Sequence, residues 1–559
     1  MYPESAHLRH GCSGVKARLP QPCKISHFFS RSFIYTSRLG ITPLGSLVGG
    51  GFLTGVGMNA NSPKRDQPSE PFPLSSGSGG ALHQLLEREI KFDIPPRFHI
   101  PDNLATPISP RVFTSTYFDT QQHRLGRLGL TLRKRIERGR GVWQLKIPSG
   151  DGRIELEIDS GSRHIPWEFL DLLTAFLRKD EPLPLGKLRT WRTGQLIREN
   201  DHFIAEVTVD SVALLQDNKI QTRLRELEIE LKEGKPEYLR TIGKIFQKSG
   251  AKPKKSQAKI FQILGLPYPL TKREFEPSTS PSEHIQARLQ SQFAQMVLHD
   301  PGTRLGRDNE ALHQMRVATR RMRAIFRAVR SFLEPEWTKR IREEIGWIGS
   351  LLGEVRDWDV LLESLEQDYS SLDLPEKQSF TPILRSFHDE RSASRARLLA
   401  GLRSDRYVDL LNVLERSLTQ LPFQQDHPTM VDLAKQSFSK LEQYVESTQC
   451  GFPRQELHRI RILVKRARYT VELTAPFLGK KAKRFLRHAK SLQEVLGQHQ
   501  DALVVESRLL SDPTMARSPG VAFVRGILVE RYRNRQHAAY RKVPRLWEKL
   551  RDSGRKLST

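Results

Sequence analysis

Two carboxylates and a lysine recur at two-residue spacing in the segment Glu87-Arg88-Glu89-Ile90-Lys91. Successive side chains of a β-strand point to opposite faces, so Glu87, Glu89 and Lys91 share one face of a strand. Carboxylate oxygens are ligands that Mg²⁺ accepts, and a lysine ammonium binds phosphate oxygens. The spacing therefore directs two candidate metal ligands and one candidate phosphate ligand at the same small volume.

Four later segments repeat this alternation of charged or polar residues with apolar ones. They contain Arg133 and Arg135; Arg153, Glu155 and Glu157; Glu206, Thr208 and Asp210; and Glu226, Glu228 and Glu230. One such segment is typical of an amphipathic strand whose charges face water. Five segments with charges of both signs favour an antiparallel barrel whose charged faces converge on a lumen.

The composition indicates several domains and an anionic partner. The chain has 559 residues with a formal net charge of +27, and nucleic acid, polyphosphate and acidic lipid all fit that charge. Its three cysteines, Cys12, Cys23 and Cys450, form no disulfide framework and no metal-type spacing, which favours a reducing, cytoplasmic compartment. No segment has the continuous apolar run that a membrane span needs, so we expect no membrane partner.

Composition and periodicity divide the chain into four parts. Residues 1–80 are rich in Gly, Ser, Pro and basic residues, and we expect a disordered leader there, or a start codon assigned too early, since Met58 opens an ordinary polar lead-in. Residues 83–268 alternate with the period of two that predicts strands. The stretch 269–282 is predicted to be a linker, and apolar residues at three- to four-residue spacing predict helices over 283–556.

The helical part contains an internal repeat of two blocks. The first block occurs as His313-x-x-Arg316-x-x-x-Arg320-Arg321-x-Arg323 and, without gaps, as His458-x-x-Arg461-x-x-x-Lys465-Arg466-x-Arg468. The second block occurs as Leu352–Asp357 and as Leu496–Asp501. From the first histidine to the last aspartate the copies span 44 and 43 residues. Two blocks at nearly equal separation predict a duplicated helical hairpin in a pseudo-twofold bundle.

The cations of each copy form a basic stripe, because they fall on one narrow face of a helix. A single basic stripe is usually a solvated face, but these stripes have few acids at i±4 to neutralise them, and they occur twice. A polyanion lying between or across the stripes would offset their mutual repulsion. His313 and His458 are poor metal ligands, because neither has a second histidine or a carboxylate at i+3 or i+4.

Polyphosphate fits these stripes better than nucleic acid does. Base stacking requires aromatic residues interleaved with the cations, and the nearest are Phe326 and Tyr469. The sequence contains no zinc-finger, basic-zipper or RNA-recognition motif. The candidate polyphosphate ligands are His313, Arg316, Arg320, Arg323, His458, Arg461, Lys465 and Arg468.

The strand-rich part resembles a known superfamily in the order and spacing of its motifs. After the Glu-x-Glu-x-Lys opening come Tyr117-Phe118-Asp119-Thr120, Leu132-Arg133-Lys134-Arg135, Leu145-Lys146, Glu226-Leu227-Glu228 and Ser256-Gln257-Ala258-Lys259. Residues 83–268 thereby resemble the CYTH, or triphosphate tunnel metalloenzyme, superfamily. The duplicated His/Arg blocks over 283–556 resemble the CHAD domain, an all-helical module associated with CYTH domains and with polyphosphate. The two together resemble bacterial CYTH–CHAD proteins, for which inorganic triphosphatase activity is the family expectation.

The resemblance implies a multidomain α+β chain, with an eight-stranded antiparallel β tunnel followed by an all-α duplicated helical bundle. It implies that a divalent cation, Mg²⁺ or Mn²⁺, is bound by Glu87, Glu89, Glu226 and Glu228. It implies that triphosphate is bound by Lys91, Arg133, Arg135, Lys146, Arg189, Arg192 and Lys259. Arg153 and Glu155 fit a lumen-facing pair that orients the substrate or a water, and they complete a catalytic set with Lys91, Arg133, Arg135 and Lys146.

Two positions leave alternatives within this pattern. Gln144 stands where the family often has Thr, two residues before Lys146, which changes contacts to the substrate but leaves the lysine in place. The register of Glu-Leu-Glu-Ile-Glu allows Glu230 to replace Glu226.

The predicted reaction is hydrolysis of inorganic triphosphate to diphosphate and phosphate, with a metal-bound water as nucleophile. A class IV-type adenylate cyclase and a thiamine triphosphatase are the rival enzymes, and the attached helical module argues against the cyclase. A non-catalytic polyphosphate-binding protein is the rival of another class, and the retention of Glu87, Glu89, Lys91, Arg133 and Arg135 weighs against it.

Overall fold

The computed structural model describes residues 82–100, 106–199, 202–255, 257–266, 280–425, 428–448, 452–511 and 518–557. The predicted leader, most of the predicted linker and the three cysteines lie outside these residues.

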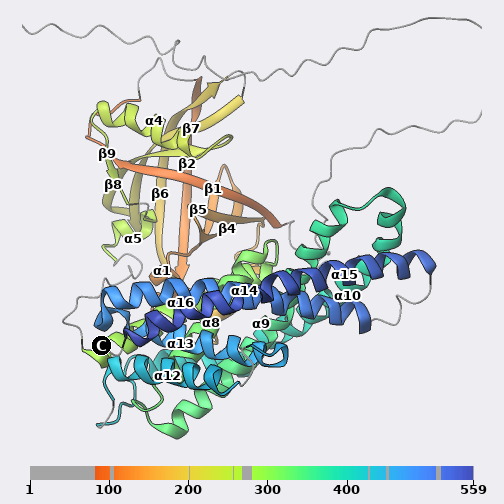
Figure 1. Ribbon diagram of the computed structural model, residues 1–559. Coiled ribbons are helices and arrows are strands. Elements are labelled where there is room, and N and C mark those ends of the chain that lie inside the picture. Colours follow the sequence, from red (N-terminus) through yellow and green to blue (C-terminus); the bar gives the residue numbers. More distant parts are fainter. Residues whose placement is uncertain are drawn as a thin grey trace, which may run out of the picture. The chain divides into compact units, whose positions relative to one another are not determined.

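The strand-rich part is one antiparallel sheet that closes on itself (Figure 1). Its strands are β1 (Leu82–Asp93), β2 (Thr106–Asp119), β3 (Thr131–Glu137), β4 (Arg140–Ser149), β5 (Gly152–Asp159), β6 (Leu183–Glu199), β7 (His202–Gln216), β8 (Lys219–Leu231) and β9 (Lys252–Lys254). The order is β5-β4-β3-β2-β6-β7-β8-β1-β9, and an additional pairing of β5 with β1 closes the barrel. The predicted eight-stranded antiparallel barrel is thus confirmed, and the short strand β9 is an addition that the sequence did not predict.

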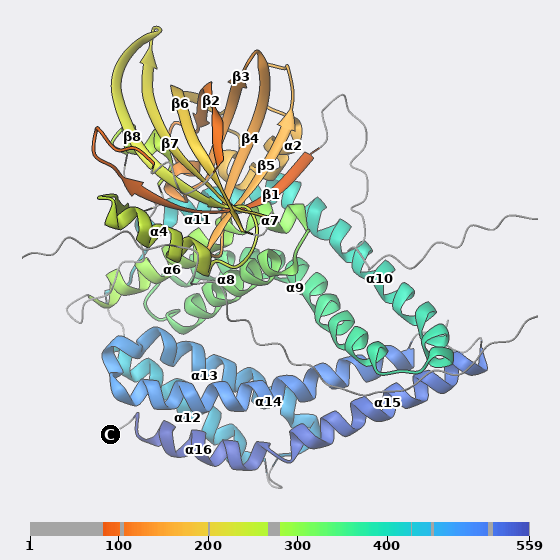
Figure 2. The ribbon, with the colours of Figure 1, turned by 90° about the horizontal axis from the view of Figure 1, so that it is seen from above.

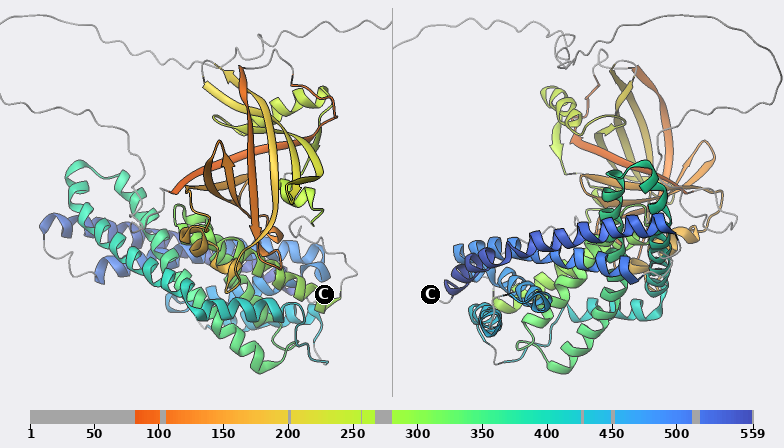
Figure 3. Two further views of the ribbon diagram at one scale, coloured as in Figure 1. Left: turned by 180° about the vertical axis from the view of Figure 1, so that it is seen from behind. Right: turned by 45° about the vertical axis from the view of Figure 1, so that its right-hand side comes forward.

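Strand β1 closes the barrel because it changes partners halfway along its length. Residues Leu82–Glu87 pair with β5, and residues Arg88–Asp93 pair with β8. β9 pairs with Lys91–Asp93, beyond the residues that pair with β5. The change of partner falls at Glu87, so the Glu-x-Glu-x-Lys segment begins at the seam. Both views of Figure 3 show the strands curving around a common interior.

The barrel carries apolar faces outward and charged faces inward. Leu227 and Ile229 of β8 are fully buried, and they belong to one hydrophobic cluster with Phe246 of helix α4 (Glu237–Lys248). Likewise, Leu145 of β4 shares a cluster with Phe169 of α2 (Trp167–Leu172). Each buried side chain of this kind contributes roughly 1.5–3 kcal/mol. Helices that cover the outer apolar faces leave the interior to the charged residues.

Most of the other described residues are helical (Figure 2). Three short helices, α1 (Arg124–Arg127), α3 (Thr174–Leu177) and α5 (Lys259–Ile263), accompany the strands. The helical part contains α6 (Pro281–Leu298), α7 (Asp300–Leu305), α8 (Asn309–Ala328), α9 (Pro335–Ser370), α10 (Leu374–Arg403), α11 (Asp405–Ser417), α12 (Met430–Ser447), a 3₁₀ turn (Arg454–Glu456), α13 (Leu457–Leu478), α14 (Lys480–Ser511), α15 (Pro519–Tyr540) and α16 (Val543–Arg555). Among the described residues, none of these helices combines the length and the apolar character that crossing a membrane requires.

The predicted repeat is visible as two helix pairs. The first copy lies on α8 and α9, which pack together, and the second lies on α13 and α14, which also pack together. The buried residues Met315 and Met322 of α8 have counterparts in Ile460 and Ala467 of α13, at the same positions of the motif. The duplicated hairpin is therefore confirmed, because both copies bury the same face of the helix that carries the basic stripe.

Candidate active site

The lumen of the barrel contains a cavity with about 490 Å³ of empty space, part of which is open to solvent. Ionisable side chains from several strands and from α5 line it. The cations are Lys91, Arg133, Lys146, Arg153, Arg192 and Lys259, and the acids are Glu87, Glu89, Asp210 and Glu228. All of them except Asp210 were predicted site residues.

One wall of the cavity is organised around Glu228. The register places Lys91 of β1 directly opposite Glu228 of β8, and the Lys91 ammonium donates to Glu228 Oε1. Lys259 Nζ, at the start of α5, also donates to Glu228 Oε1 at 2.5 Å, and Arg192 Nη2 donates to Glu228 Oε2 at 2.9 Å. Burial opposes ionisation of Glu228, but these three cations outweigh it and hold the pKa of Glu228 well below its usual range.

Asp210 of β7 joins the same wall from a fully buried position. Arg192 forms a bidentate pair with it, Nε to Oδ1 at 2.7 Å and Nη2 to Oδ2 at 2.6 Å, and Lys259 Nζ lies 3.0 Å from Oδ2. Burial raises the pKa of Asp210, but Lys259 and Arg192 lower it by more, so the net shift is downward. The alternation of Glu206, Thr208 and Asp210 is the sequence signal that could have identified this residue.

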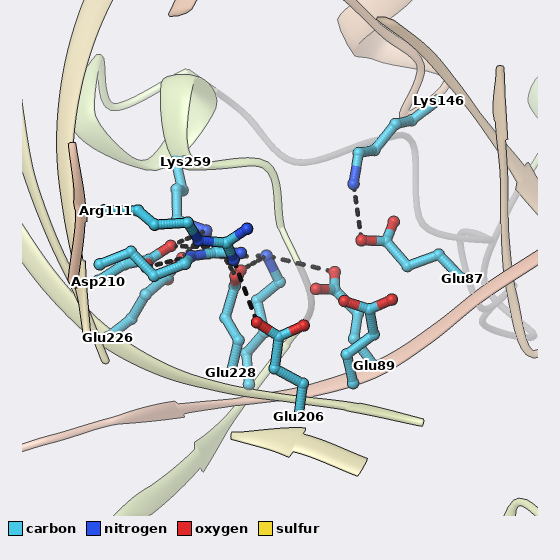
Figure 4. A network of polar contacts seen from close by, with 12 residues as sticks. Glu87, Glu89, Arg111, Lys146, Glu206, Asp210, Glu226, Glu228 and Lys259 are labelled. Atoms are coloured by element: carbon cyan, nitrogen blue, oxygen red, sulfur yellow. Dashed lines mark hydrogen bonds and ion pairs between the residues drawn. The ribbon is translucent and has the colours of Figure 1, made fainter. Parts of the chain in front are cut away.

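A second, smaller group stands apart from the Glu228 wall in the lumen (Figure 4). Lys146 Nζ donates to Glu87 Oε1 at 2.6 Å and lies 3.2 Å from Glu155 Oε2. Burial raises the pKa of Glu155, but Lys146 and Arg133 lower it by more. Glu155 is not among the cavity-lining residues, so it acts on the cavity through its contact with Lys146.

Arg133 is held in place by two neutral side chains. Its Nε donates to Gln144 Oε1 at 2.7 Å, and its Nη1 donates to the Tyr117 hydroxyl at 3.0 Å. Gln144 lies opposite Arg133 in the β3–β4 register, and its amide nitrogen donates to Glu157. The glutamine that departs from the family pattern therefore orients a cation of the cavity.

Two predicted substrate ligands do not line the cavity. Arg135 pairs with Glu137, and its Cζ lies 4.1 Å from the centre of the Phe113 ring, so it stands beside an aromatic residue that does line the cavity. Arg189 is exposed on β6, three residues from Arg192 and therefore on the opposite face of the strand. The placement of Arg189 in the lumen is thus corrected, because strand alternation turns this residue outward.

The four carboxylates of the predicted metal-binding set differ in their position relative to the cavity. Glu226 is fully buried, pairs with Lys254 at 2.7 Å and Lys259 at 3.0 Å, and does not line the cavity. The alternative residue Glu230 pairs with Lys232 at 2.8 Å and does not line it either. Of the three alternating glutamates of β8, Glu228 alone is a cavity-lining residue.

The predicted metal ligands that line the cavity have the chemistry to hold a divalent cation together with phosphate oxygens. Within the described ranges, no three His, Cys, Asp or Glu side chains form a ready-made metal site. Mg²⁺ needs only one or two carboxylates when phosphate oxygens and waters complete its shell. Glu87, Glu89 and Glu228 line one cavity, and Glu87 Oε2 is a buried oxygen without a hydrogen-bond partner in the described part of the chain.

The two basic stripes of the helical part meet, because α8 packs against α13. Burial, together with Arg461, Arg320 and Arg316, lowers the pKa of Lys465 to about 7. Arg316 Nη2 donates to Asp357 Oδ1 at 3.0 Å, so the aspartate of the second block offsets part of this charge. The structure thus brings the central cations of both copies into one surface.

The outer members of the stripes have separate contacts. His458 Nδ1 lies 2.9 Å from Gln500 Oε1, and Arg468 Nη1 donates to Gln493 Oε1 at 3.1 Å. Burial, followed by Arg356, lowers the pKa of His313.

Comparison with known proteins finds a matching domain family for each of two parts of the chain. Residues 85–260 match the CYTH domain family, and residues 287–510 match the CHAD domain family. An uncharacterized protein of Mycobacterium tuberculosis strain CDC 1551 / Oshkosh is 27% identical over 512 residues, which cover 84% of this chain and 98% of that protein.

Two solved structures are similar to parts of the chain. The CHAD domain from the plant Ricinus communis is 24% identical with a TM-score of 0.40, covering 52% of this chain and 96% of that one. PptA from Streptomyces chartreusis is 19% identical with a TM-score of 0.41, covering 48% of this chain and 100% of that one.

Proposed function

We propose that this chain, which carries a CYTH domain followed by a CHAD domain, hydrolyses inorganic triphosphate to diphosphate and phosphate inside its tunnel. The match to the CYTH domain family supports a tunnel enzyme of that family. The choice of substrate is argued from the residues that line the cavity. One observation carries that choice: the cavity is lined by six cations, and the aromatic residues among its lining are Phe113 and Tyr117. Such a lining offers a triphosphate many charge-assisted contacts.

The cations are arranged to exchange carboxylate partners for phosphate oxygens. Lys146 donates a hydrogen bond to Glu87, and Lys91 and Lys259 donate to Glu228. A triphosphate that accepts hydrogen bonds from these lysines releases carboxylate oxygens on both sides of the cavity. Binding of the anion and freeing of the acids are therefore coupled.

Two of the three cavity-lining guanidinium groups are held by protein partners before substrate arrives. Gln144 and Tyr117 hold Arg133, and the bidentate pair with Asp210 holds Arg192. Fixed donors stabilise developing negative charge on phosphoryl oxygens without reorganising during the reaction.

The metal ligands we propose are Glu87, Glu89 and Glu228. The chemistry that Mg²⁺ or Mn²⁺ supplies at such a site is neutralisation of phosphate charge and a lowered pKa of water. The protein's own contribution at Glu228 is to keep that carboxylate ionised. For Glu228, burial acts against this, and Lys259, Lys91 and Arg192 reverse it by lowering its pKa.

We propose that the CHAD domain binds polyphosphate along the joined stripes. The observation behind this is the meeting of Arg316, Arg320, Arg461 and Lys465, which concentrates positive charge on one surface. A flexible polyanion lowers the repulsion within that surface.

The experiment for the tunnel is a phosphate-release screen of the purified chain with Mg²⁺ or Mn²⁺. Triphosphate, ATP, thiamine triphosphate and long-chain polyphosphate are the substrates, and we expect release to be fastest from triphosphate. Faster release from thiamine triphosphate, or cyclic AMP formed from ATP, would replace the proposal with one of the rival activities. Polyphosphate binding without release from any substrate would favour a purely binding protein.

A further inference from the structure

A group of five arginines lies around the C-terminal end of α8. We call it the arginine cluster, and its members are Arg323, Arg327, Arg330, Arg342 and Arg466. Arg323 and Arg466 belong to the repeated motif, but the other three do not. At the motif position of Arg327, the second copy has Glu472, which carries the opposite charge.

The members come from α8 and the residues just after it, from α9 and from α13, and α8 packs against both of the other helices. Arg327 is in the last turn of α8 and Arg330 follows that helix, Arg342 lies near the start of α9, and Arg466 is on α13. The Arg323 guanidinium lies over Gly346 of α9, where an added Cβ atom would stand 3.4 Å from Arg323 Cζ. The glycine leaves room for the arginine to lie against the neighbouring helix.

Glu343 lies near the cluster and offsets part of its charge without forming an ion pair with it. None of its five guanidinium groups forms an ion pair or hydrogen bond with a carboxylate among the residues that the structure describes. The Nε atoms of Arg342 and Arg466 are buried without hydrogen-bond partners in those same residues. Burial, Arg323 and Arg330 lower the pKa of Arg342, and the opposing effect of Glu343 is smaller.

The same imbalance appears at Arg327, where burial and then Arg466, Arg342, Arg323 and Arg330 lower its pKa to about 10. A cation in the last turn of a helix is ordinarily favourable, because it faces the negative end of the helix dipole. That effect applies to Arg327, and Arg323 and Arg330 are exposed to solvent. Arg342 and Arg466 are the members with buried donors that have no partner among the described residues. Unpaired buried donors and mutual repulsion both cost free energy, and a bound anion removes both costs.

The cluster continues the basic stripe of α8. Arg327 lies within about 20° of Arg316 around the helix and about 16 Å further along it. Arg323 belongs to the stripe and to the cluster, so the positive surface is continuous between them. A triphosphate has only three phosphate groups and cannot bridge that distance, whereas a long polyphosphate can.

We propose that the arginine cluster is a second phosphate subsite, which only long polyphosphate chains reach while they occupy the stripes. This inference rests on the proposed polyphosphate binding and adds to it a preference for chain length. A polyphosphate chain that spans both subsites binds more tightly than a short one. Once it occupies the first subsite, its binding to the second is intramolecular.

The test uses the full chain, a fluorescent long-chain polyphosphate, and unlabelled polyphosphates of increasing length as competitors. Arg342→Glu should weaken long-chain binding about tenfold or more and should flatten the gain in competition with length. Arg340→Glu is the matched control, because Arg340 is exposed two residues earlier on the same helix and the change in charge is identical. We expect less than about a twofold effect from it, as for an exposed charge outside the subsite.

A milder variant keeps the result interpretable if charge reversal unfolds the protein. Arg342→Gln should reduce the salt dependence of long-chain binding, because one phosphate contact is lost. The slope of the logarithm of the binding constant against the logarithm of the salt concentration should fall by about one. It should also raise the melting temperature in anion-free buffer, because it relieves repulsion, whereas Arg340→Gln should not.

The outcomes distinguish a failed subsite from a failed polyphosphate surface. Equal effects of Arg342→Glu and Arg340→Glu, with Arg316→Glu still weakening binding, would overturn the subsite and leave polyphosphate binding by the stripes intact. If the unaltered chain does not bind long-chain polyphosphate, both fail. If DNA of equal charge competes as well as polyphosphate, the occupant is a general polyanion and the chain-length assignment falls.

Discussion

Among individual side chains, the tunnel is lined by ion pairs, which the substrate rearranges in the mechanism that we propose. Glu87 holds Lys146, and Glu228 holds Lys91, Lys259 and Arg192. In a buried network of this kind, removing one partner leaves another charge uncompensated. Substitutions in the tunnel should therefore be judged on kinetic constants together with stability.

Replacing Glu89 with Gln should abolish phosphate release that depends on a divalent cation while leaving the fold intact. The change removes a carboxylate charge from the cavity wall beside Lys91, whose Nζ lies 3.2 Å from Glu89 Oε1. Phosphate release measured across a range of Mg²⁺ concentrations checks this, with Glu181→Gln as the control, since Glu181 is exposed outside the cavity. Undiminished activity in Glu89→Gln would remove Glu89 from the proposed metal site.

Replacing Tyr117 with Phe should raise KM for triphosphate roughly tenfold. Arg133 then loses one of its two orienting hydrogen bonds, and a hydrogen bond to a charged group contributes about 1.5–3 kcal/mol. The matched control is Tyr238→Phe. It removes a hydroxyl that lies away from the cavity and donates to Glu199 Oε2 at a distance of 3.1 Å. Steady-state kinetics that show the same small change in both variants would contradict a positioning role for Tyr117.

Among the strands and helices, the two proposed sites depend on contacts between elements that are distant in sequence. The switch of β1 from β5 to β8 puts Glu87 at the seam of the barrel, and the packing of α8 on α13 joins two basic stripes. The lowered pKa of Lys465 is a direct consequence of the second contact, since burial is joined there by arginines from both helices.

Polyphosphate binding should weaken as the pH rises above about 7. Burial and then Arg461, Arg320 and Arg316 bring the pKa of Lys465 to about 7, against the smaller opposing effect of Asp501, so the lysine is largely neutral above that pH in the free protein. A bound polyanion favours the protonated lysine and raises its pKa. Between the free and the bound pKa, binding therefore takes up a proton, and affinity falls by at most about tenfold per pH unit. Below pH 7 Lys465 is already charged, and its contribution no longer changes.

The measurement is the dissociation constant of the full chain for long-chain polyphosphate from about pH 6 to about pH 9 at constant ionic strength, a range that brackets the lysine pKa. Lys465→Arg is the control variant, because an arginine keeps its charge throughout this range. A pH dependence that persists unchanged in Lys465→Arg would assign the effect to another group.

Taken as a whole molecule, the chain carries a closed tunnel and an open basic surface, which suit different lengths of the same kind of anion. The tunnel presents donors from several strands to a short phosphate chain. The helical surface offers cations along its helices, with acids such as Asp357 beside them. An enzyme for short chains attached to a surface for long chains is the organisation that we propose.

Charge reversal at Arg316 and Arg461 together should weaken polyphosphate binding more than either change alone, because the two copies contribute to one surface. Each single change should cost roughly tenfold in affinity, as expected for one charge-assisted contact. Binding should also weaken steeply with salt, as it does when phosphate neutralisation releases counterions. A double variant no weaker than the single variants would show that only one stripe is occupied.

Local patterns in the chain were sufficient to predict the alternating strands, the repeat and most of the candidate site. Period-two alternation sets which residues share a strand face, so Glu87, Glu89 and Lys91 could be grouped before any strand pairing was known. Spacing along a helix likewise identified the basic stripes. These properties depend only on residues a few positions apart.

Packing between distant elements settled which of those faces meet. Strand pairing places Glu228 opposite Lys91, whereas Glu226 forms an ion pair with Lys254. Strand alternation does not distinguish the two glutamates, because both lie on one face of the strand. The face of β6 that carries Arg192 points into the lumen, and the face that carries Arg189 points away from it. In the arginine cluster, Arg323, Arg327 and Arg330 recur at helical spacing in the sequence, but only packing between helices brings Arg342 and Arg466 to them.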